Sequence, residues 1–250
     1  MKKILFLIPH PDDEIVGACK IIKKLLDKKK KVFIFFLTNG IIDKSSMWFW
    51  ERRNYDNNLN IRLNEMKESM NELGIKNYFI QNIPSRSLKN NISKTFFKIK
   101  KIIEKNFIDS IFCPSYEGGH QDHDVTNFIC SRLKNDCKIF EFAEYNYFGK
   151  QIHSNSFFNN FNKAETLNLN ESEKKFKKKC LKIYRSEKKN LNYISIVKEV
   201  YRKLPMHNYK EPPHKGVLFY RRFSFFSWHP RVDKDRPEEV CKKITQSKIF

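Results

Sequence analysis

The first 150 residues alternate short apolar runs with amphipathic segments. Apart from the run at 138–142, which contains Lys138 and Glu141, the runs are continuously apolar, as in strands that are buried on both faces of a parallel sheet. They cover residues 4–8, 32–37, 78–80, 111–113 and 138–142. Between them, apolar residues recur at helical spacing over 15–26, 62–73, 95–105 and 125–133. This order predicts an α/β fold with a Rossmann-like, mostly parallel sheet sandwiched by helices.

The pattern weakens beyond residue 150. Residues 154–170 have no clear period, and residues 172–190 form a predicted basic helix. The run at 217–220 predicts a strand added at the sheet edge, and the tail after Trp228 is expected at the surface. No linker divides the chain, so we expect one domain over 1–250, with a core of about 1–150 and a C-terminal strand and helix extension of about 151–250.

The first apolar run ends in a cluster of polar side chains. His10, Asp12 and Asp13 follow Pro9, which stops the strand, and they precede a predicted helix. In open α/β sheets, ligands bind at the carboxyl ends of the strands. His10 and Asp13 are three positions apart and can bind zinc together, while Asp12 can take a proton from water. Helix capping is the alternative, but it explains the carboxylates and not His10.

A second cluster, with His120, Asp122 and His123, follows the run at 111–113. It again precedes a helix-like segment. If the two strands are neighbours, both clusters open into one crevice. The first cluster and one histidine of the second would then supply the three protein ligands of a catalytic zinc site. A polar loop with Asp122 as a helix cap is the alternative.

The two clusters resemble the signatures of a known family. The segments PHPDDE (residues 9–14) and HQDH (residues 120–123) are similar to the motifs of the PIG-L/LmbE-like zinc-dependent N-deacetylases. Weaker similarity extends to residues 37–40, 62–74 and 209–216, and to Glu144, Tyr145 and Asn146, for which burial without function is the alternative. Gln121 stands where the family usually has proline, which weakens the assignment of the substrate more than that of the chemistry.

This resemblance implies a reaction, a cofactor and a set of site residues. The enzyme would remove an acetyl group from an N-acetylated sugar, often a glucosamine derivative, with one Zn²⁺ per chain. The implied zinc ligands are His10, Asp13 and His123. The implied catalytic residues are the general base Asp12, the oxyanion-stabilising imidazolium His120, and Asp122, which would orient His120.

Four further residues are candidates for contact with the substrate: Arg62, Trp48, Tyr116 and His214. Arg62 belongs to the helix that resembles the family, and His214 lies in a rigid segment that can border the pocket. Trp48 lies in a predicted loop over 41–60, where its ring can stack on a sugar and nearby arginines can meet a phosphate or nucleotide. The loop aromatics can instead pack on the domain or a partner, and Tyr116 can assist the oxyanion or only pack.

The composition is strongly basic, with 49 Lys and Arg against 28 Asp and Glu, a net charge of +21. The lysines are spread along the chain, so we interpret the charge mainly as composition, with a contribution from an anionic substrate. None of the six cysteines forms a C-x-x-C motif, which argues against a cysteine zinc site and for a reducing, cytoplasmic location. No stretch reaches the roughly 20 apolar residues of a membrane span.

Three functions remain open on the sequence alone. The favoured function is a zinc N-deacetylase that acts on an N-acetylated sugar or glycoconjugate. The second is a zinc amidase that acts on a non-sugar amide. The third is a basic protein that binds nucleic acid or anionic lipid, but the sequence lacks an RNA-binding fingerprint, so we expect no specific nucleic-acid partner.

Overall fold

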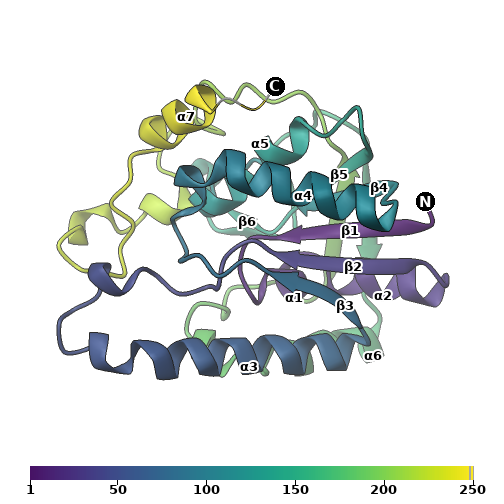
Figure 1. The fold of residues 1–250 in the computed structure, drawn as a ribbon, viewed down its shortest axis with the longest axis horizontal. Coiled ribbons are helices and arrows are strands. Elements are labelled where there is room, and N and C mark those ends of the chain that lie inside the picture. The colour runs from purple at the N-terminus through teal and green to yellow at the C-terminus, as the bar shows by residue number, and fades with distance from the viewer. Residues whose placement is uncertain (248, 250) are drawn as a thin grey trace.

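The computed structural model describes residues 1–247 and residue 249, and its centre is a seven-stranded sheet (Figure 1). The strands of this sheet are β1 (Lys3–Ile8), β2 (Lys31–Phe36), β3 (Asn77–Ile80), β4 (Ser110–Pro114), β5 (Lys138–Phe142), β8 (Ala164–Asn168) and β9 (Lys198–Lys203). Their order is β3-β2-β1-β4-β5-β9-β8. The first five in this order are parallel, and β9 and β8 are added in antiparallel pairing. The mostly parallel sheet expected from the apolar runs is confirmed.

Helices cover both faces of the sheet (Figure 1). One face carries α1 (Asp13–Val16), α2 (Cys19–Asp27), α3 (Tyr55–Leu73) and α6 (Glu171–Leu181). The other face carries α4 (Ile92–Asn106), α5 (Gln121–Ser131) and α7 (Pro237–Gln246). A short ribbon of β6 (Tyr145–Asn146) and β7 (His153–Ser154) lies outside the main sheet. None of the helices in the described residues is long and apolar enough to cross a membrane.

β1 contributes to the cores on both faces of the sheet. Leu5 and Leu7 belong to the cluster under α4, α5 and α7, whereas Ile4, Phe6 and Ile8 belong to the cluster under the opposite layer. This division follows from the alternation of side chains along a strand. Because both faces are covered, the strand is apolar at every position, which is why its sequence predicted it so clearly.

The single helix expected over 15–26 is interrupted. α1 ends at Val16 and α2 begins at Cys19, with Gly17 between them. A Cβ atom at Gly17 would lie 2.6 Å from Cδ2 of Phe142 on β5. This is closer than van der Waals contact permits, so only glycine allows the chain to approach the sheet here.

The C-terminal extension differs from the prediction in its strands. Residues 217–220 form no strand, and Phe219–Arg221 is a 3₁₀ turn. The sheet is extended instead by β8 and β9. β8 is an edge strand whose residues are almost all exposed. Main-chain pairing holds such a strand whatever its side chains are, so the apolar pattern could not reveal it.

The helices of this extension also differ from the prediction. α6 ends at Leu181, well before the expected end of the basic helix at residue 190. The tail after Trp228 is not all surface, because α7 buries Val240, Cys241 and Ile244 against the core.

A buried ion pair fastens α6 to the sheet. Lys177 Nζ lies 2.7 Å from Glu199 Oε1 on β9, and both side chains are fully buried. Lys177 also donates to the carbonyl oxygen of Val16 at 2.9 Å. The other oxygen of Glu199 accepts the N–H groups of Lys20 and Ile21 at the start of α2. The pair therefore links α1, α2, α6 and β9.

Removal of one partner would leave the other charge buried and unpaired. We expect Lys177→Ala to lower the free energy of unfolding by about 3–5 kcal/mol, measured by urea denaturation. Lys174→Ala is the matched control on the same helix, because it removes an ion pair with the exposed Glu171 and should leave the midpoint nearly unchanged. Similar effects of the two variants would contradict this account.

Candidate active site

The two sequence clusters meet at one end of the sheet. β1 and β4 are adjacent and parallel, with Phe6 opposite Phe112, so the loops that follow them lie together. They border a cavity of about 1250 Å³, at the end toward which the β1 and β2 arrows point in Figure 1. The loop before α3 and the segment before α7 also line this cavity. The expected crevice is therefore present, and it holds more of the C-terminal extension than the sequence indicated.

Three potential ligand atoms converge beside the cavity. Asp13 Oδ2 lies 3.1 Å from His10 Nδ1 and 3.2 Å from His123 Nε2. Ligand atoms about 2.0–2.1 Å from a tetrahedral zinc ion lie about 3.4 Å from one another, so these spacings are close to those of a metal site. His123 is fully buried, and neither ring nitrogen forms a hydrogen bond with the described residues. A cation among these atoms would satisfy this otherwise orphaned ring.

Two further carboxylates contact the ring nitrogens of His10 and His123 that face away from Asp13. Asp122 Oδ2 lies 3.0 Å from His10 Nε2, and Glu144 Oε2 lies 3.3 Å from His123 Nδ1. If Nε2 of His10 donates to Asp122, Nδ1 keeps a lone pair that faces the other ligand atoms. Carboxylates in this position orient metal-binding imidazoles and fix their tautomer. The donor set and its support therefore fit a divalent metal ion.

More than one combination of these side chains could bind a metal ion. The ligand atoms of His10, His120 and His123 lie within 4.8 Å of one another, and so do those of Asp13, His123 and Glu144. The two groups share His123, which lies between them. The set predicted from the sequence takes members from both groups, and its role as the ligand set stays a prediction.

The electrostatics of the site favour positive charge. Burial lowers the pKa of His10, but Asp13 and Asp122 outweigh burial and raise this pKa to about 10. Burial raises the pKa of Asp13, whereas His123 and His10 hold it well below its usual value. A group of carboxylates that retains a proton on a buried imidazole also attracts a metal cation.

Asp12 lines the cavity from an unusual backbone conformation. Its φ of 134° and ψ of −30° lie in a region that side chains rarely adopt, and such strain is typical of functional positions. Its N–H donates to Glu14 at 3.0 Å, and its Oδ2 lies 3.4 Å from Arg62 Nη1. Burial and the charge of Asp13 raise the pKa of Asp12 well above its usual value, and Arg62 opposes this. These features suit a carboxylate that accepts a proton.

His120 caps α5 and lines the cavity. Its Nδ1 accepts the backbone N–H of Asp122 at 3.1 Å. Because a backbone N–H can only donate, the neutral imidazole carries its proton on Nε2. Burial and the charge of His10 lower the pKa of His120 well below its usual value. The structure therefore supports a neutral N–H donor at this position, in place of the expected imidazolium.

Asp122 does not orient His120 as expected. Its carboxylate lies 3.7 Å from His120 Nδ1, and no hydrogen bond joins the two side chains. The carboxylate bonds to His10 and also accepts the backbone N–H of Arg86 at 2.6 Å. The structure thus replaces the expected Asp122–His120 pair with an Asp122–His10 pair.

Two of the four substrate candidates lie at the cavity. Arg62 lines it, and its guanidinium contacts both Asp12 and Glu187. Trp48 does not line the cavity itself, but the adjacent Met47 does. The positive charge of Arg62 is already balanced by two carboxylates, so Arg62 is a weaker phosphate ligand than the sequence indicated.

The other two substrate candidates lie away from the cavity. Tyr116 donates to the carbonyl oxygen of Glu211 at 2.6 Å and contacts Cys241 on α7. The ring of His214 packs against Phe148 at a centroid distance of 5.6 Å, and its Nδ1 donates a hydrogen bond to the backbone carbonyl oxygen of Lys215. Neither side chain lines the cavity. Their placement corrects the prediction: both are packing residues between loops.

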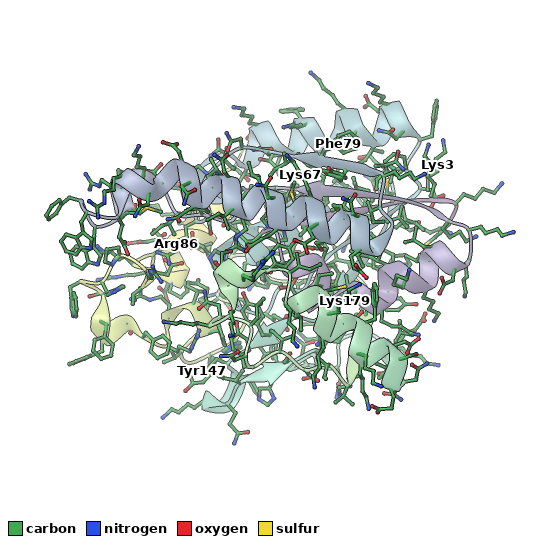
Figure 2. All side chains as sticks on the ribbon, turned by 90° about the horizontal axis from the view of Figure 1, so that it is seen from below. Lys3, Lys67, Phe79, Arg86, Tyr147 and Lys179 are labelled. Atoms are coloured by element: carbon green, nitrogen blue, oxygen red, sulfur yellow. The ribbon has the colours of Figure 1, made fainter. Side chains whose placement is uncertain are left out.

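The C-terminal segment is fastened to the site by residues that the sequence did not single out. The side chain of Arg86 donates to the carbonyl oxygens of Pro230, Arg231 and Val232, and Figure 2 shows it beside this yellow segment. Gln121 donates to Asp233 at 2.6 Å. The residue that departs from the family pattern therefore ties α5 to the segment that closes the cavity. These contacts span more than 100 positions, and no local signal predicts them.

Comparison with known proteins identifies the family. The PIG-L family, described as GlcNAc-PI de-N-acetylase, matches residues 5–134, which carry both clusters and just over half of the chain. The chain belongs to the PIG-L family. The predicted class of enzyme, a hydrolytic N-deacetylase, is confirmed at the level of the family. A search of curated proteins found no match.

Solved structures share the fold of this PIG-L family member. N,N'-diacetylchitobiose deacetylase from Pyrococcus horikoshii is 21% identical, with a TM-score of 0.59 over 82% of this chain and 84% of that chain. The zinc-inhibited form of teicoplanin deacetylase Orf2 is 11% identical, with a TM-score of 0.61 over 80% and 97%. GalB, the 4-carboxy-2-hydroxymuconate hydratase from Pseudomonas putida KT2440, is 12% identical, with a TM-score of 0.51 over 83% and 98%. At these identities the likeness shows the fold alone, and one fold hosts different reactions.

Proposed function

We propose that this protein is a zinc-dependent N-deacetylase that hydrolyses the acetamide of an N-acetylated amino sugar or sugar conjugate. The observation that carries the proposal is the convergence of His10, Asp13 and His123 beside the cavity, where neither ring nitrogen of His123 forms a hydrogen bond with the described residues. The family supports deacetylation. One fold neighbour is a diacetylchitobiose deacetylase, which is in line with an N-acetylated sugar as the substrate, and another was crystallised in a zinc-inhibited form, so zinc can bind to a protein of this fold.

In this proposal the protein side chains divide the work of one hydrolysis. Zinc, when bound, supplies a Lewis acid that polarises the acetamide carbonyl and favours hydroxide at neutral pH. Asp12 accepts the proton of the attacking water, and its raised pKa allows it to keep that proton. Arg62 holds the carboxylate in place through the contact at 3.4 Å. Asp12 then returns the proton to the amine nitrogen as the C–N bond breaks, which leaves acetate and a free amine.

His120 is the proposed donor to the developing oxyanion. Its Nε2–H is available because Nδ1 is engaged with the backbone. A donor that is fixed before the reaction needs no reorganisation, and the loss of one such donor typically lowers the rate by about 10²–10³-fold. The fixed tautomer therefore suits His120 to this role as a neutral group.

The cavity also has a candidate position for an anionic part of the substrate. Arg222 lines the cavity, and its guanidinium packs on the rings of Phe219 and Phe223. Burial lowers the pKa of Arg222, and the nearby groups that oppose this shift are all tyrosines. Within the part of the chain that the structure describes, no carboxylate pairs with it. A phosphate on the sugar is the group that this position fits best.

Acetate release from a panel of N-acetyl compounds tests the proposed function. We expect release from N-acetylglucosamine conjugates and at most traces from N-acetyl amino acids. A phosphate-bearing sugar should exceed its neutral counterpart in kcat/KM by about 10–100-fold, since a hydrogen bond to a charged group contributes about 1.5–3 kcal/mol. Arg222→Met should remove this advantage.

Three other results would redirect the proposal. Equal rates with neutral and phosphorylated sugars would remove the phosphate subsite. Acetate release from simple amides alone would favour the non-sugar amidase. Hydration of an unsaturated acid without acetate release would place the protein with the hydratase neighbour instead.

A further inference from the structure

Seven aromatic side chains gather on the surface beside the cavity mouth. We call this set the aromatic patch, and it includes every tryptophan of the chain. Phe225 is 89% exposed, Phe49 is 75% exposed and Trp228 is 65% exposed. Large exposed groups of rings are unusual on a free surface and mark a site of interaction. The members are Trp48, Phe49, Trp50, Phe223, Phe225, Phe226 and Trp228.

Two loops that are far apart in the sequence build the aromatic patch. Residues 47–50 precede α3, and residues 223–228 precede α7. In Figure 1 the two segments lie side by side at the left, beyond the ends of β1 and β2. The ring centroids of Trp48 and Trp228 are 6.3 Å apart, and Trp48 stacks on Trp50 at 4.9 Å. The rings of the two loops therefore form one continuous surface.

Basic residues flank the aromatic patch along both of its loops. Residues 44–53 and 220–234 together carry seven basic residues and two acidic ones. Of the two acids, Asp233 is buried and Glu51 faces Arg231 at 3.4 Å. Among the basic residues, Lys44 is paired with Asp56 at 3.8 Å. The exposed rings thus lie in a positive field that complements an anionic surface. The basic residues are Lys44, Arg52, Arg53, Arg221, Arg222, Arg231 and Lys234.

We propose that the aromatic patch docks this protein on an anionic membrane surface. Tryptophan and phenylalanine beside arginine and lysine are the side chains that enter the interface of a bilayer. Met47, Glu51 and Phe223 line the cavity, so docking would turn the cavity mouth toward the lipid headgroups. A second copy of the chain seated on the patch would instead bring two basic surfaces of the same charge together, which is unfavourable. This argument favours a membrane over self-association.

The tryptophans make the proposal directly measurable. The full chain should sediment with vesicles of phosphatidylcholine and phosphatidylglycerol, and its tryptophan emission should shift to the blue, because every tryptophan lies in the patch. Binding to pure phosphatidylcholine vesicles should be at least about tenfold weaker, and added salt should weaken binding to the anionic vesicles.

Matched variants separate the patch from exposed rings in general. Phe49→Ser, Trp50→Ser and Phe225→Ser together should lower the vesicle partition coefficient at least about tenfold. None of these three residues lines the cavity. Phe97→Ser with Phe107→Ser is the control, because these rings are 57% and 77% exposed on and after α4, and it should bind as the parent does. Circular dichroism checks that both variants fold.

Four outcomes would overturn the proposal. One is the absence of binding to anionic vesicles, and another is an equal loss in the patch variant and the control. A blue shift that grows with protein concentration in the absence of vesicles, with dimers in sedimentation equilibrium, would make the patch a self-association surface. A shift with soluble N-acetylated oligosaccharides alone would make it a sugar platform. All these measurements are independent of deacetylase activity, so the proposed function can fail or hold separately.

Discussion

Asp12→Asn should lower kcat by about a thousandfold and leave the metal content unchanged. The carboxamide keeps the shape of the side chain and its contact with Arg62, but it cannot accept a proton. General-base catalysis of this kind contributes about 10²–10⁴-fold to a rate. Asp12 is not in the predicted ligand set, so zinc measured by elemental analysis should stay at about one ion per chain. Acetate release under saturating substrate gives kcat.

Asp124→Asn is the matched control for this experiment. Asp124 is another buried aspartate, but it lies outside the cavity lining and accepts the backbone N–H of Gly118 at 3.1 Å. Asparagine keeps the shape of this side chain and its Oδ1 acceptor for the N–H of Gly118. Its kcat should stay near that of the parent. If Asp12→Asn retained kcat within tenfold of the parent, Asp12 would not be the general base.

His10→Ala and His123→Ala should each abolish both zinc binding and activity. Each removes one of only three predicted protein ligands, and the neighbouring carboxylates cannot complete the site alone. Glu144→Gln should act more mildly. Glu144 contacts the far nitrogen of His123 at 3.3 Å, and the loss of such outer partners typically lowers metal affinity about 10–100-fold. Competition with a chromophoric chelator measures these affinities without any assay of turnover.

His153→Ala is the control for the ligand variants. His153 lies in the ribbon of β6 and β7, where its Nε2 donates a hydrogen bond to the carbonyl oxygen of Phe148. This variant should bind zinc as the parent does. The predicted metal site is wrong if His10→Ala and His123→Ala bind as much zinc as His153→Ala.

The buried half of the fold could be predicted because burial leaves a local pattern. β1 and β2 are interior strands of the sheet that are covered on both faces, so their sequences are almost unbroken apolar runs. β8 lies at the edge, exposes nearly every side chain and leaves no such pattern. The same limit applies to Gly17. The helix is interrupted there because the backbone packs against the ring of Phe142 on β5, which is more than 100 positions away in the sequence.

The sequence indicated which residues gather at the site better than it indicated which of them form hydrogen bonds with one another. Residue type and position after a strand indicated that His10, Asp13 and one histidine of the second cluster would gather, and the family resemblance chose His123. The direction of a carboxylate depends on the donors that surround it in space, and Asp122 therefore turned to His10 rather than to His120. Tyr116 and His214 show the same limit, since nothing local separates a packing ring from a pocket ring.

The sequence by itself determined the α/β class, the parallel core and the two polar clusters, because each depends on side chains that are close together along the chain. The tertiary structure alone decided that β1 and β4 are neighbours, which histidine each carboxylate supports, and how the C-terminal segment closes the cavity. It also decided that all the tryptophans share one surface. These features join residues that are up to 180 positions apart, as in the contact of Arg231 with Glu51. Local spacing carries no record of such pairs, since their geometry is fixed only when the sheet order brings the loops together.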